Sequence, residues 1–89
     1  MKLATLRALV AAIEEGSLRA AARRVGMSQP ALTKMIRELE RELGTTLLAR
    51  STTGVAATAQ GKVLYERALA ADRELGHAVD QIRQLDGRM

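Results

Sequence analysis

The chain has 89 residues, and 47% of them are hydrophobic, so it is long and apolar enough for one small domain with a modest core. It has no cysteine, which excludes disulfides, zinc-thiolate sites and thiol nucleophiles. Its net charge is +4. Its apolar runs are far shorter than the roughly 20 residues of a membrane span.

The positive charge is concentrated in the first two thirds of the chain. Residues 1–58 hold nine Lys or Arg and five Glu, whereas residues 59–89 hold five basic and five acidic residues. A localised basic surface predicts a polyanionic partner, either nucleic acid or an acidic membrane surface. A soluble basic domain without such a partner is the alternative that charge alone leaves open.

Two helices are predicted before residue 27. Gly16 ends the first, whose apolar side chains share one face at about 100° per residue: Leu3, Leu6, Leu9, Val10 and Ile13. Ser17 is a good N-cap for the second helix, which runs from Leu18 to Val25. Alanines at 20–22 allow another helix to approach closely, and Gly26 permits a tight reversal.

A third helix is predicted from about Ser28 to Leu43, and it contains the only proline of the chain. Pro30 costs little in the first turn, because amides there lack intrahelical partners. Either Ser28 or Gln29 is the N-cap. Proline disfavours helical geometry in the residue before it, which favours Gln29 lying outside the helix proper. Gly44 ends the helix.

Residues 45–58 show no helical period and predict a short two-stranded ribbon, or wing. Their sequence, TTLLARSTTGVAAT, places β-branched residues on either side of a turn signal, with Gly54 at the turn. Strands this short can fall below the length needed for assignment. Thr58 then caps a fourth helix, which runs to about Leu85 and is roughly 40 Å long.

The fourth helix carries apolar residues at heptad spacing along one seam. A helix this long cannot fold back onto so small a domain, so the C-terminal half of the seam needs a partner. A second copy of the chain is the simplest partner, and an effector domain outside this chain is the alternative. The predicted seam consists of Leu64, Ala68, Ala71, Leu75, Ala78, Ile82 and Leu85.

One face of the third helix is rich in hydrogen-bond donors. An arc of about 140° opposite the apolar side chains holds Gln29, Thr33, Arg37, Pro30, Arg41 and Lys34. Ordinary surface helices also have solvated polar faces. Here, however, a short helix and a tight Gly turn come first, which is the helix-turn-helix pattern. The residue types at the start of the helix are those that contact base edges and thymine methyls, so we predict DNA recognition.

The individual residues at the start of this helix fit that function. Pro30 and Ala31 form a rigid apolar tip that fits against thymine methyls, and Gln29 can pair with adenine. Thr33 and Lys34, one turn further on, face the floor of the groove.

The stretch GSLRAAARRVGMSQPALTKMIRELERELGTTLLARS resembles the N-terminal domain of LysR-type transcriptional regulators. The resemblance covers nearly the whole chain. It implies a winged helix-turn-helix that dimerises through antiparallel linker helices and binds an interrupted inverted repeat, with T at one end and A at the other. It also implies base contacts from Gln29, Pro30, Ala31, Thr33 and Lys34, and phosphate contacts from Ser28 and Arg50.

The sequence departs from that family in two respects. Members often have an arginine near the wing tip, where this chain has Thr52 and Thr53, so we expect less minor-groove recognition. Leu9 and Leu48 replace aromatic residues common in the family, which predicts a more aliphatic core. Threonine can still bond phosphate, so the full set of predicted phosphate contacts is Ser28, Arg37, Arg50, Thr52 and Thr53.

The resemblance also implies a C-terminal effector-binding domain that this chain lacks. We therefore expect the chain to be a fragment, with any small-molecule inducer site in the missing domain.

Other polar residues have ordinary structural explanations. His77 is the only histidine and lacks nearby cysteines or clustered carboxylates, so we expect a surface or dimer-interface role. Tyr65 is expected to pack against the helix-turn-helix body. Glu38, Glu40 and Glu42 alternate with Arg37 and Arg41, which predicts ion pairs along the helix. No nucleophile–base pair is present, so we expect no enzyme activity, no cofactor and no metal.

The sequence thus predicts a mainly α fold, a winged helix-turn-helix over residues 1–58 followed by a linker and dimerisation helix over residues 59–89. The expected partners are double-stranded DNA and a second copy of the chain, without a membrane, in the bacterial cytoplasm. One alternative is a homodimerisation module whose function is the seam itself. Another is a nonspecific nucleoid-type DNA binder, against which the uncharged Gln-Pro-Ala tip argues.

Overall fold

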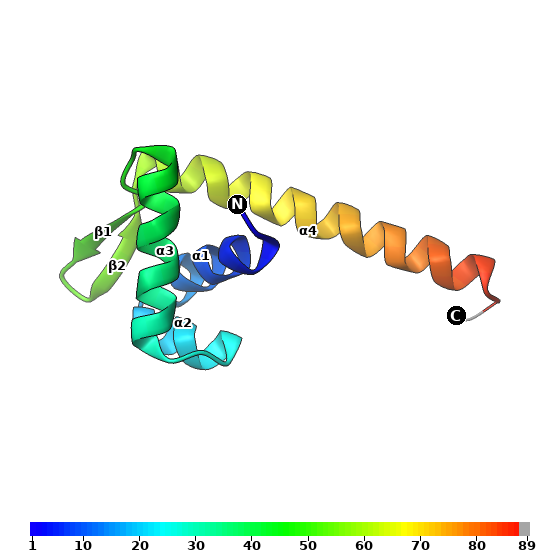
Figure 1. Ribbon diagram of the computed structural model, residues 1–89, viewed down its shortest axis with the longest axis horizontal. Coiled ribbons are helices and arrows are strands. Elements are labelled where there is room, and N and C mark those ends of the chain that lie inside the picture. Colours follow the sequence, from blue (N-terminus) through cyan, green and yellow to red (C-terminus); the bar gives the residue numbers. More distant parts are fainter. Residues whose placement is uncertain (88–89) are drawn as a thin grey trace.

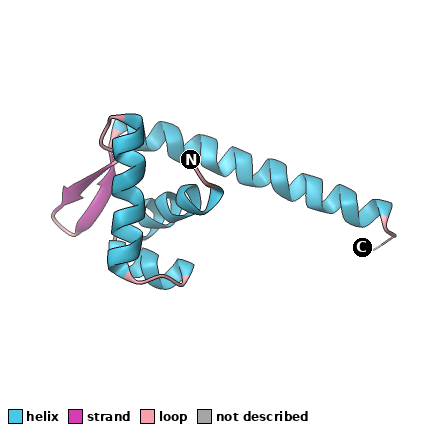
Figure 2. Cartoon of the chain, in the orientation of Figure 1, coloured by secondary structure: helices cyan, strands magenta, loops and turns pink. Residues whose placement is uncertain are grey.

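The computed structural model describes residues 1–87, which form four helices and a small two-stranded sheet (Figures 1 and 2). The helices are α1 (Leu3–Glu15), α2 (Leu18–Val25), α3 (Gln29–Leu43) and α4 (Ala59–Leu85); the strands are β1 (Leu48–Ser51) and β2 (Gly54–Ala57). This confirms the predicted winged helix-turn-helix with a long C-terminal helix. The last part of the predicted linker segment, residues 88–89, lies outside the described residues.

Alanine dominates the core where α1 and α2 meet. Small side chains allow these two helices to pack closely, and Leu32 and Ile36 of α3 complete the cluster. The buried alanines are Ala8, Ala11, Ala12, Ala21 and Ala22. A second cluster joins α1 and α3 to the segment before β1 and consists of Leu9, Leu39 and Leu47. No described core position is aromatic, as the sequence predicted.

Ser28, and not Gln29, is the N-cap of α3. The Ser28 hydroxyl accepts a hydrogen bond from the Ala31 amide at 3.3 Å, and the Ser28 carbonyl accepts one from the Leu32 amide at 3.1 Å. The expectation that Gln29 lies outside the helix is therefore wrong. Proline only disfavours helical geometry at the preceding residue, and the two cap bonds offset this preference. Pro30 lies in the first turn, where it sacrifices no intrahelical bond.

The wing is a regular antiparallel pair of four-residue strands. Both strands are long enough to be assigned, unlike the shorter strands that the sequence analysis allowed for. Leu48 pairs with Ala57, and Ser51 pairs with Gly54 at the turn. The Val55 amide donates to the carbonyl of Gly16 at 3.0 Å. That bond fixes β2 against the turn between α1 and α2, so the wing has a defined position relative to the helices.

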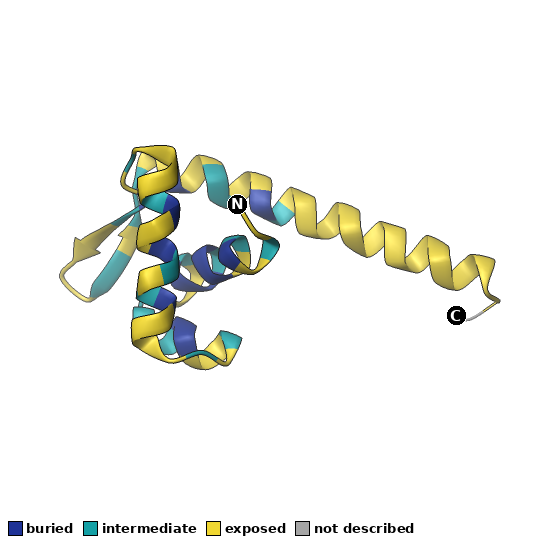
Figure 3. Ribbon diagram, in the orientation of Figure 1, coloured by how far each residue is buried: buried dark blue, intermediate teal, exposed yellow. Residues whose placement is uncertain are grey.

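Helix α4 has 27 residues and extends far beyond the other elements (Figure 1). With α4 included, the longest dimension of the molecule is 49 Å. Its first three turns pack on the body through Gly61, Leu64 and Ala68. From Ala70 to Gly87 every residue is exposed (Figure 3). Among residues 1–87, no helix combines the length and apolar composition needed to cross a bilayer.

The predicted dimer seam divides into a part that packs on the body and a part that is exposed. Leu64 is half-buried against the second core cluster, and Ala68 is only 5% exposed, so both already contact their own chain. The first three turns are needed to attach α4 to the body, which uses the apolar face that the heptad pattern assigned to a partner. The seam positions that remain exposed are Ala71, Leu75, Ala78, Ile82 and Leu85, and the neighbouring Val79 is exposed as well.

Candidate nucleic-acid interface

A hollow along the outer face of α3, here called the donor hollow, carries the predicted recognition residues. It is lined by Gln29, Pro30, Thr33, Lys34, Arg37 and Arg41. Thr33 is half-buried and the other five are exposed. Four of the five predicted base contacts therefore lie on one continuous surface together with two arginines. No carboxylate lines this surface, so it presents positive charge and hydrogen-bond donors to a ligand.

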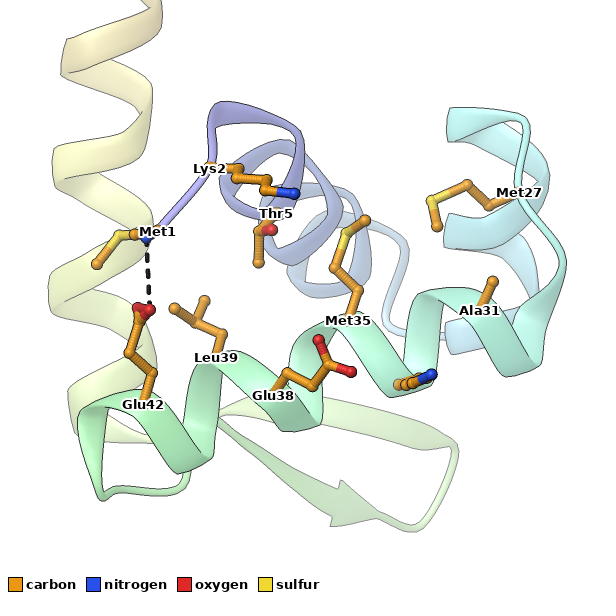
Figure 4. A pocket seen from close by; sticks show the side chains of 10 residues that line it. Met1, Lys2, Thr5, Met27, Ala31, Met35, Glu38, Leu39 and Glu42 are labelled. Carbon is orange, nitrogen blue, oxygen red and sulfur yellow. Dashed lines mark hydrogen bonds and ion pairs between the residues drawn. The ribbon is translucent and has the colours of Figure 1, made fainter.

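Ala31, the fifth predicted base contact, lies on another side of the helix tip. It is exposed, but it lines a second hollow between α3 and the N-terminal end of α1 (Figure 4). Lys34 lines both hollows. The second hollow also contains Glu38 and Glu42, and the Met1 ammonium group pairs with Glu42 at 3.4 Å. This side of α3 is electrostatically less suited to a polyanion than the donor hollow.

The basic side chains of the donor hollow are free of intramolecular ion pairs within residues 1–87. Lys34, Arg37 and Arg41 form no salt bridge there. The expected pairing of Arg37 and Arg41 with the glutamates of α3 is therefore wrong. Glu40 and Glu42 have other partners, the wing amides and the Met1 ammonium group, and Glu38 forms no ion pair within residues 1–87.

The second half of the interface is a groove between α2, α3 and the wing, here called the wing groove. Arg37 of α3 and Arg50 of β1, both predicted phosphate contacts, line it together, as do Gln29 and Thr33. Arg19 of α2 also lines it, and the sequence analysis did not single out this residue. Its only sequence signal is its position two residues after the cap Ser17.

The remaining predicted phosphate contacts lie at the two ends of this surface. Ser28 is exposed, and its hydroxyl oxygen is already the acceptor of the α3 cap. The hydroxyl proton remains able to donate. Thr52 and Thr53 are exposed at the wing turn and do not line the wing groove. The structure thus brings Arg37 and Arg50 together but keeps the two threonines apart from them.

Glu40 connects the recognition helix to the wing, a role that the sequence analysis missed. Its Oε2 atom accepts hydrogen bonds from the amides of Leu47 at 2.7 Å and Leu48 at 3.2 Å. Thr58 closes the other side of the wing, because its hydroxyl donates to the carbonyl of Thr46 at 2.7 Å. These bonds fix both strands relative to α3. No local sequence pattern indicated the Glu40 bonds, because their partners lie seven and eight residues away.

A polar cluster joins α4 to α1 and α2, on the side of Tyr65. The Tyr65 hydroxyl donates to Glu14 Oε2 at 2.7 Å, and Arg24 bonds Glu14 at 2.8 Å and Glu15 at 3.2 Å. The hydrogen bonds from Tyr65 and then from Arg24 lower the pKa of Glu14. The Glu14 carboxylate in turn raises the pKa of Tyr65. About two turns from this cluster along both α1 and α4, Arg7 bonds Asp72 at 2.9 Å. Two polar links therefore orient α4 on the helix-turn-helix.

The sequence of this chain is similar to those of known bacterial regulators. The family model for bacterial regulatory helix-turn-helix proteins of the lysR family matches residues 3–62. The HTH-type transcriptional regulator TfdS of Cupriavidus pinatubonensis is 40% identical over 94 residues, which covers 97% of this chain and 32% of that protein. The chain thus spans about a third of the length of this relative.

Two solved structures are similar over nearly their full length. The crystal structure of the BenM DNA-binding domain in complex with benA site 1 DNA has a TM-score of 0.90 and 34% identity, and the match covers 97% of each chain. The complex of the CbnR DNA-binding domain with DNA has a TM-score of 0.87 and 35% identity, covering 97% of this chain and 99% of that one. The chain belongs to the lysR family of bacterial regulatory helix-turn-helix proteins.

Proposed function

We propose that this chain binds double-stranded DNA sequence-specifically, as a dimer, and serves as the DNA-binding part of a bacterial transcription regulator. The observation that carries the proposal is the donor hollow. It combines short polar side chains suited to base edges with unpaired basic side chains suited to phosphate, on the exposed face of the second helix of a helix-turn-helix. The similarity to the BenM and CbnR DNA complexes supports it.

Base selection is assigned to the first two turns of α3. Placed in the major groove, Gln29 offers an amide that can bond adenine in a bidentate manner, and Pro30 and Ala31 offer apolar surface to thymine methyls. Thr33 and Lys34 extend the contact along the groove floor. Since Ala31 lies on the side of α3 away from Thr33, the two cannot contact the same base edge. Ala31 and Thr33 then face opposite walls of the major groove.

Register on the duplex is assigned to contacts with the phosphate backbone. The predicted set is Ser28, Arg37, Arg50, Thr52 and Thr53, and these residues span the tip of α3, its outer face and the wing. Such contacts set position and supply affinity without sequence information.

Dimerisation is assigned to the exposed part of α4. Leu75, Val79 and Ile82 are 45–57% exposed, and Leu85 is 88% exposed, which is unfavourable for an isolated helix in water. A second copy of the chain that packs along this stripe would bury it, together with Ala71 and Ala78. The dimer would then present two α3 helices to successive major grooves, which requires an inverted repeat.

The domain acts by placement, without enzymatic chemistry, and its location is the DNA-containing cytoplasm of the bacterial cell. We assign residues 1–58 to DNA contact and the following helix to assembly. Because the chain spans a third of the relative TfdS, we assign any inducer-binding site to a further domain of a longer protein.

The test is a selection followed by a salt series. Sites enriched from a random-sequence duplex pool are compared with scrambled versions of the same composition, at rising salt. We expect tighter binding to the enriched sites at every salt concentration. We expect Gln29→Ala to cost about 1–3 kcal/mol on the enriched site and much less on its scramble. Gln84→Ala, on the far side of α4, is the matched control. Equal affinity of the unaltered chain for both duplexes would refute sequence-specific binding.

A further inference from the structure

The wing groove contains three arginines that come from three different elements. Arg19 lies in the first turn of α2, Arg37 in the middle of α3 and Arg50 in β1, and all three are exposed. Only the fold brings them together, because Arg19 and Arg50 are 31 residues apart in the sequence. The convergence of three guanidinium groups on one groove is a feature typical of phosphate binding.

All three arginines are available for an external anion. Within residues 1–87, none of them forms a salt bridge or a side-chain hydrogen bond, whereas Arg7 and Arg24 are each bonded to carboxylates. The fold therefore neutralises Arg7 and Arg24, and it leaves the three arginines of the wing groove unpaired.

The one carboxylate that lines the wing groove reduces its positive charge but forms no salt bridge with any of the three arginines. Glu40 Oε2 is fixed by the amides of Leu47 and Leu48, so it cannot swing towards an arginine without breaking both hydrogen bonds. The two hydrogen bonds of Glu40 also fix the start of β1, the strand that carries Arg50. The groove keeps a net positive charge and defined walls.

A backbone contact fixes the wing relative to α2. The Val55 amide bonds the carbonyl of Gly16, one residue before the α2 cap, at 3.0 Å. This contact ties the wing directly to the start of the helix that carries Arg19. The distance between Arg19 and the wing is thus set by backbone contacts and is not left to a flexible loop.

We propose that Arg19 is a further DNA-contacting residue, and that the wing groove holds one sugar–phosphate strand between α2 and α3 on one side and the wing on the other. The inference rests on the proposed DNA-binding function and extends it to α2. With α3 in the major groove, the strand that borders this groove must pass between α3 and the wing. Arg19 then neutralises a phosphate of the same strand as Arg50, from the opposite wall.

The first experiment measures the salt dependence of binding for Arg19→Gln and Arg73→Gln. Both substitutions remove one positive charge per chain, but Arg73 is exposed on α4, far from the wing groove. Each phosphate contact adds about 0.9 to the slope of log K against log salt, so we expect the slope of an Arg19→Gln dimer to fall by about 2. Arg73→Gln should keep the slope of the unaltered chain. Thermal unfolding of both variants checks that the fold is retained, and Arg19→Lys should restore most of the slope.

A second experiment locates the contact. In a duplex with an enriched site, each phosphodiester is replaced in turn by an uncharged methylphosphonate. We expect one position in each half-site at which the unaltered chain loses affinity and Arg19→Gln loses no further affinity.

An unchanged salt slope in Arg19→Gln, or the absence of such a position, would overturn the assignment while sequence-specific binding stands. A changed preference between enriched and scrambled sites would overturn it too, because it would assign Arg19 to bases. If the unaltered chain showed no preference for enriched over scrambled sites, the proposed function itself would be refuted.

Discussion

The two halves of α4 share the spacing of their apolar residues but lie in different environments. From Ala59 to about Leu69 the helix packs on the body, and from Ala70 onward every described residue is exposed. Both halves carry apolar residues at the same spacing. In the first half this spacing closes a core within one chain, and in the second half the same spacing leaves a stripe for another chain. A heptad pattern therefore identifies which side of a helix is apolar, but it does not identify what covers that side.

This difference has an energetic consequence. The first half of α4 is stabilised by tertiary contacts with α1 and the segment before β1. Within residues 1–87, the polar contact of the second half with the body is the exposed ion pair between Arg7 and Asp72. Isolated helical segments of this length are only marginally stable in water. The second half should therefore gain stability from association, so that its helix content depends on protein concentration.

The largest effect is expected from a charge placed in the exposed stripe. Ile82→Glu removes an apolar side chain that a dimer would bury twice, at about 1.5–3 kcal/mol for each copy, so dimerisation should weaken by about 3–6 kcal/mol. Sedimentation equilibrium measures the change. Gln84→Glu introduces the same charge on the opposite side of α4 and should leave the dimer intact. Equal dissociation constants for the two variants would show that the stripe is not the dimer interface.

A pair of glycine substitutions compares the two halves of α4 directly. A methyl group on Gly61 would collide with the backbone carbonyl of Leu47, whereas one on Gly76 would meet no heavy atom within 4 Å. We expect Gly61→Ala to destabilise the chain by about 1–3 kcal/mol through overpacking. Gly76→Ala should stabilise it by roughly 0.5–1 kcal/mol, because alanine is the better helix former. Urea unfolding followed by circular dichroism measures both changes, and destabilisation by Gly76→Ala would contradict the exposed position of this residue.

The smallest effect concerns the polar cluster that joins the first half of α4 to the body. Folding lowers the pKa of Glu14 from its ordinary value of 4.5, through hydrogen bonds from Tyr65 and Arg24. The cluster therefore stabilises the fold at pH values above 4.5, and this stabilisation is lost as the pH falls through the lowered pKa of the folded state. The effect is modest because the groups are solvent-accessible.

Thermal unfolding of the unaltered chain and of Glu14→Gln, from neutral pH into the acid range, measures this contribution. The difference between the two midpoints should shrink as the pH falls. A constant difference across that range would show that the Glu14 carboxylate makes no pH-dependent contribution. Glu66→Gln, with an exposed carboxylate on α4, is the control.

The sequence by itself determined the boundaries of the elements and the composition of the α3 surface. Gly16, Ser17, Gly44 and Thr58 mark helix ends, and the hydrogen bonds by which each caps its helix reach residues no more than four positions away. The donor-rich arc of α3 likewise follows from the helical period alone. Signals of this range are complete in a short segment. The local error at Gln29 arose because two local preferences competed, and the stronger one could not be identified without the cap geometry. The second local error, the expected ion pairs of Arg37 and Arg41 along α3, concerned side chains that the spacing brings within reach but does not force to pair.

Tertiary structure alone decided which surfaces are covered and which distant side chains meet. The burial of Ala68 and the partial burial of Leu64 depend on how α4 packs against elements that are far from it in the sequence. For the same reason, no sequence pattern indicated the bonds of Glu40 to the wing or the convergence of Arg19 with Arg50. Tyr65 was expected to pack against the body, but its partner Glu14 was not indicated. The pattern of a helix fixes the direction of its side chains, but only packing fixes their neighbours.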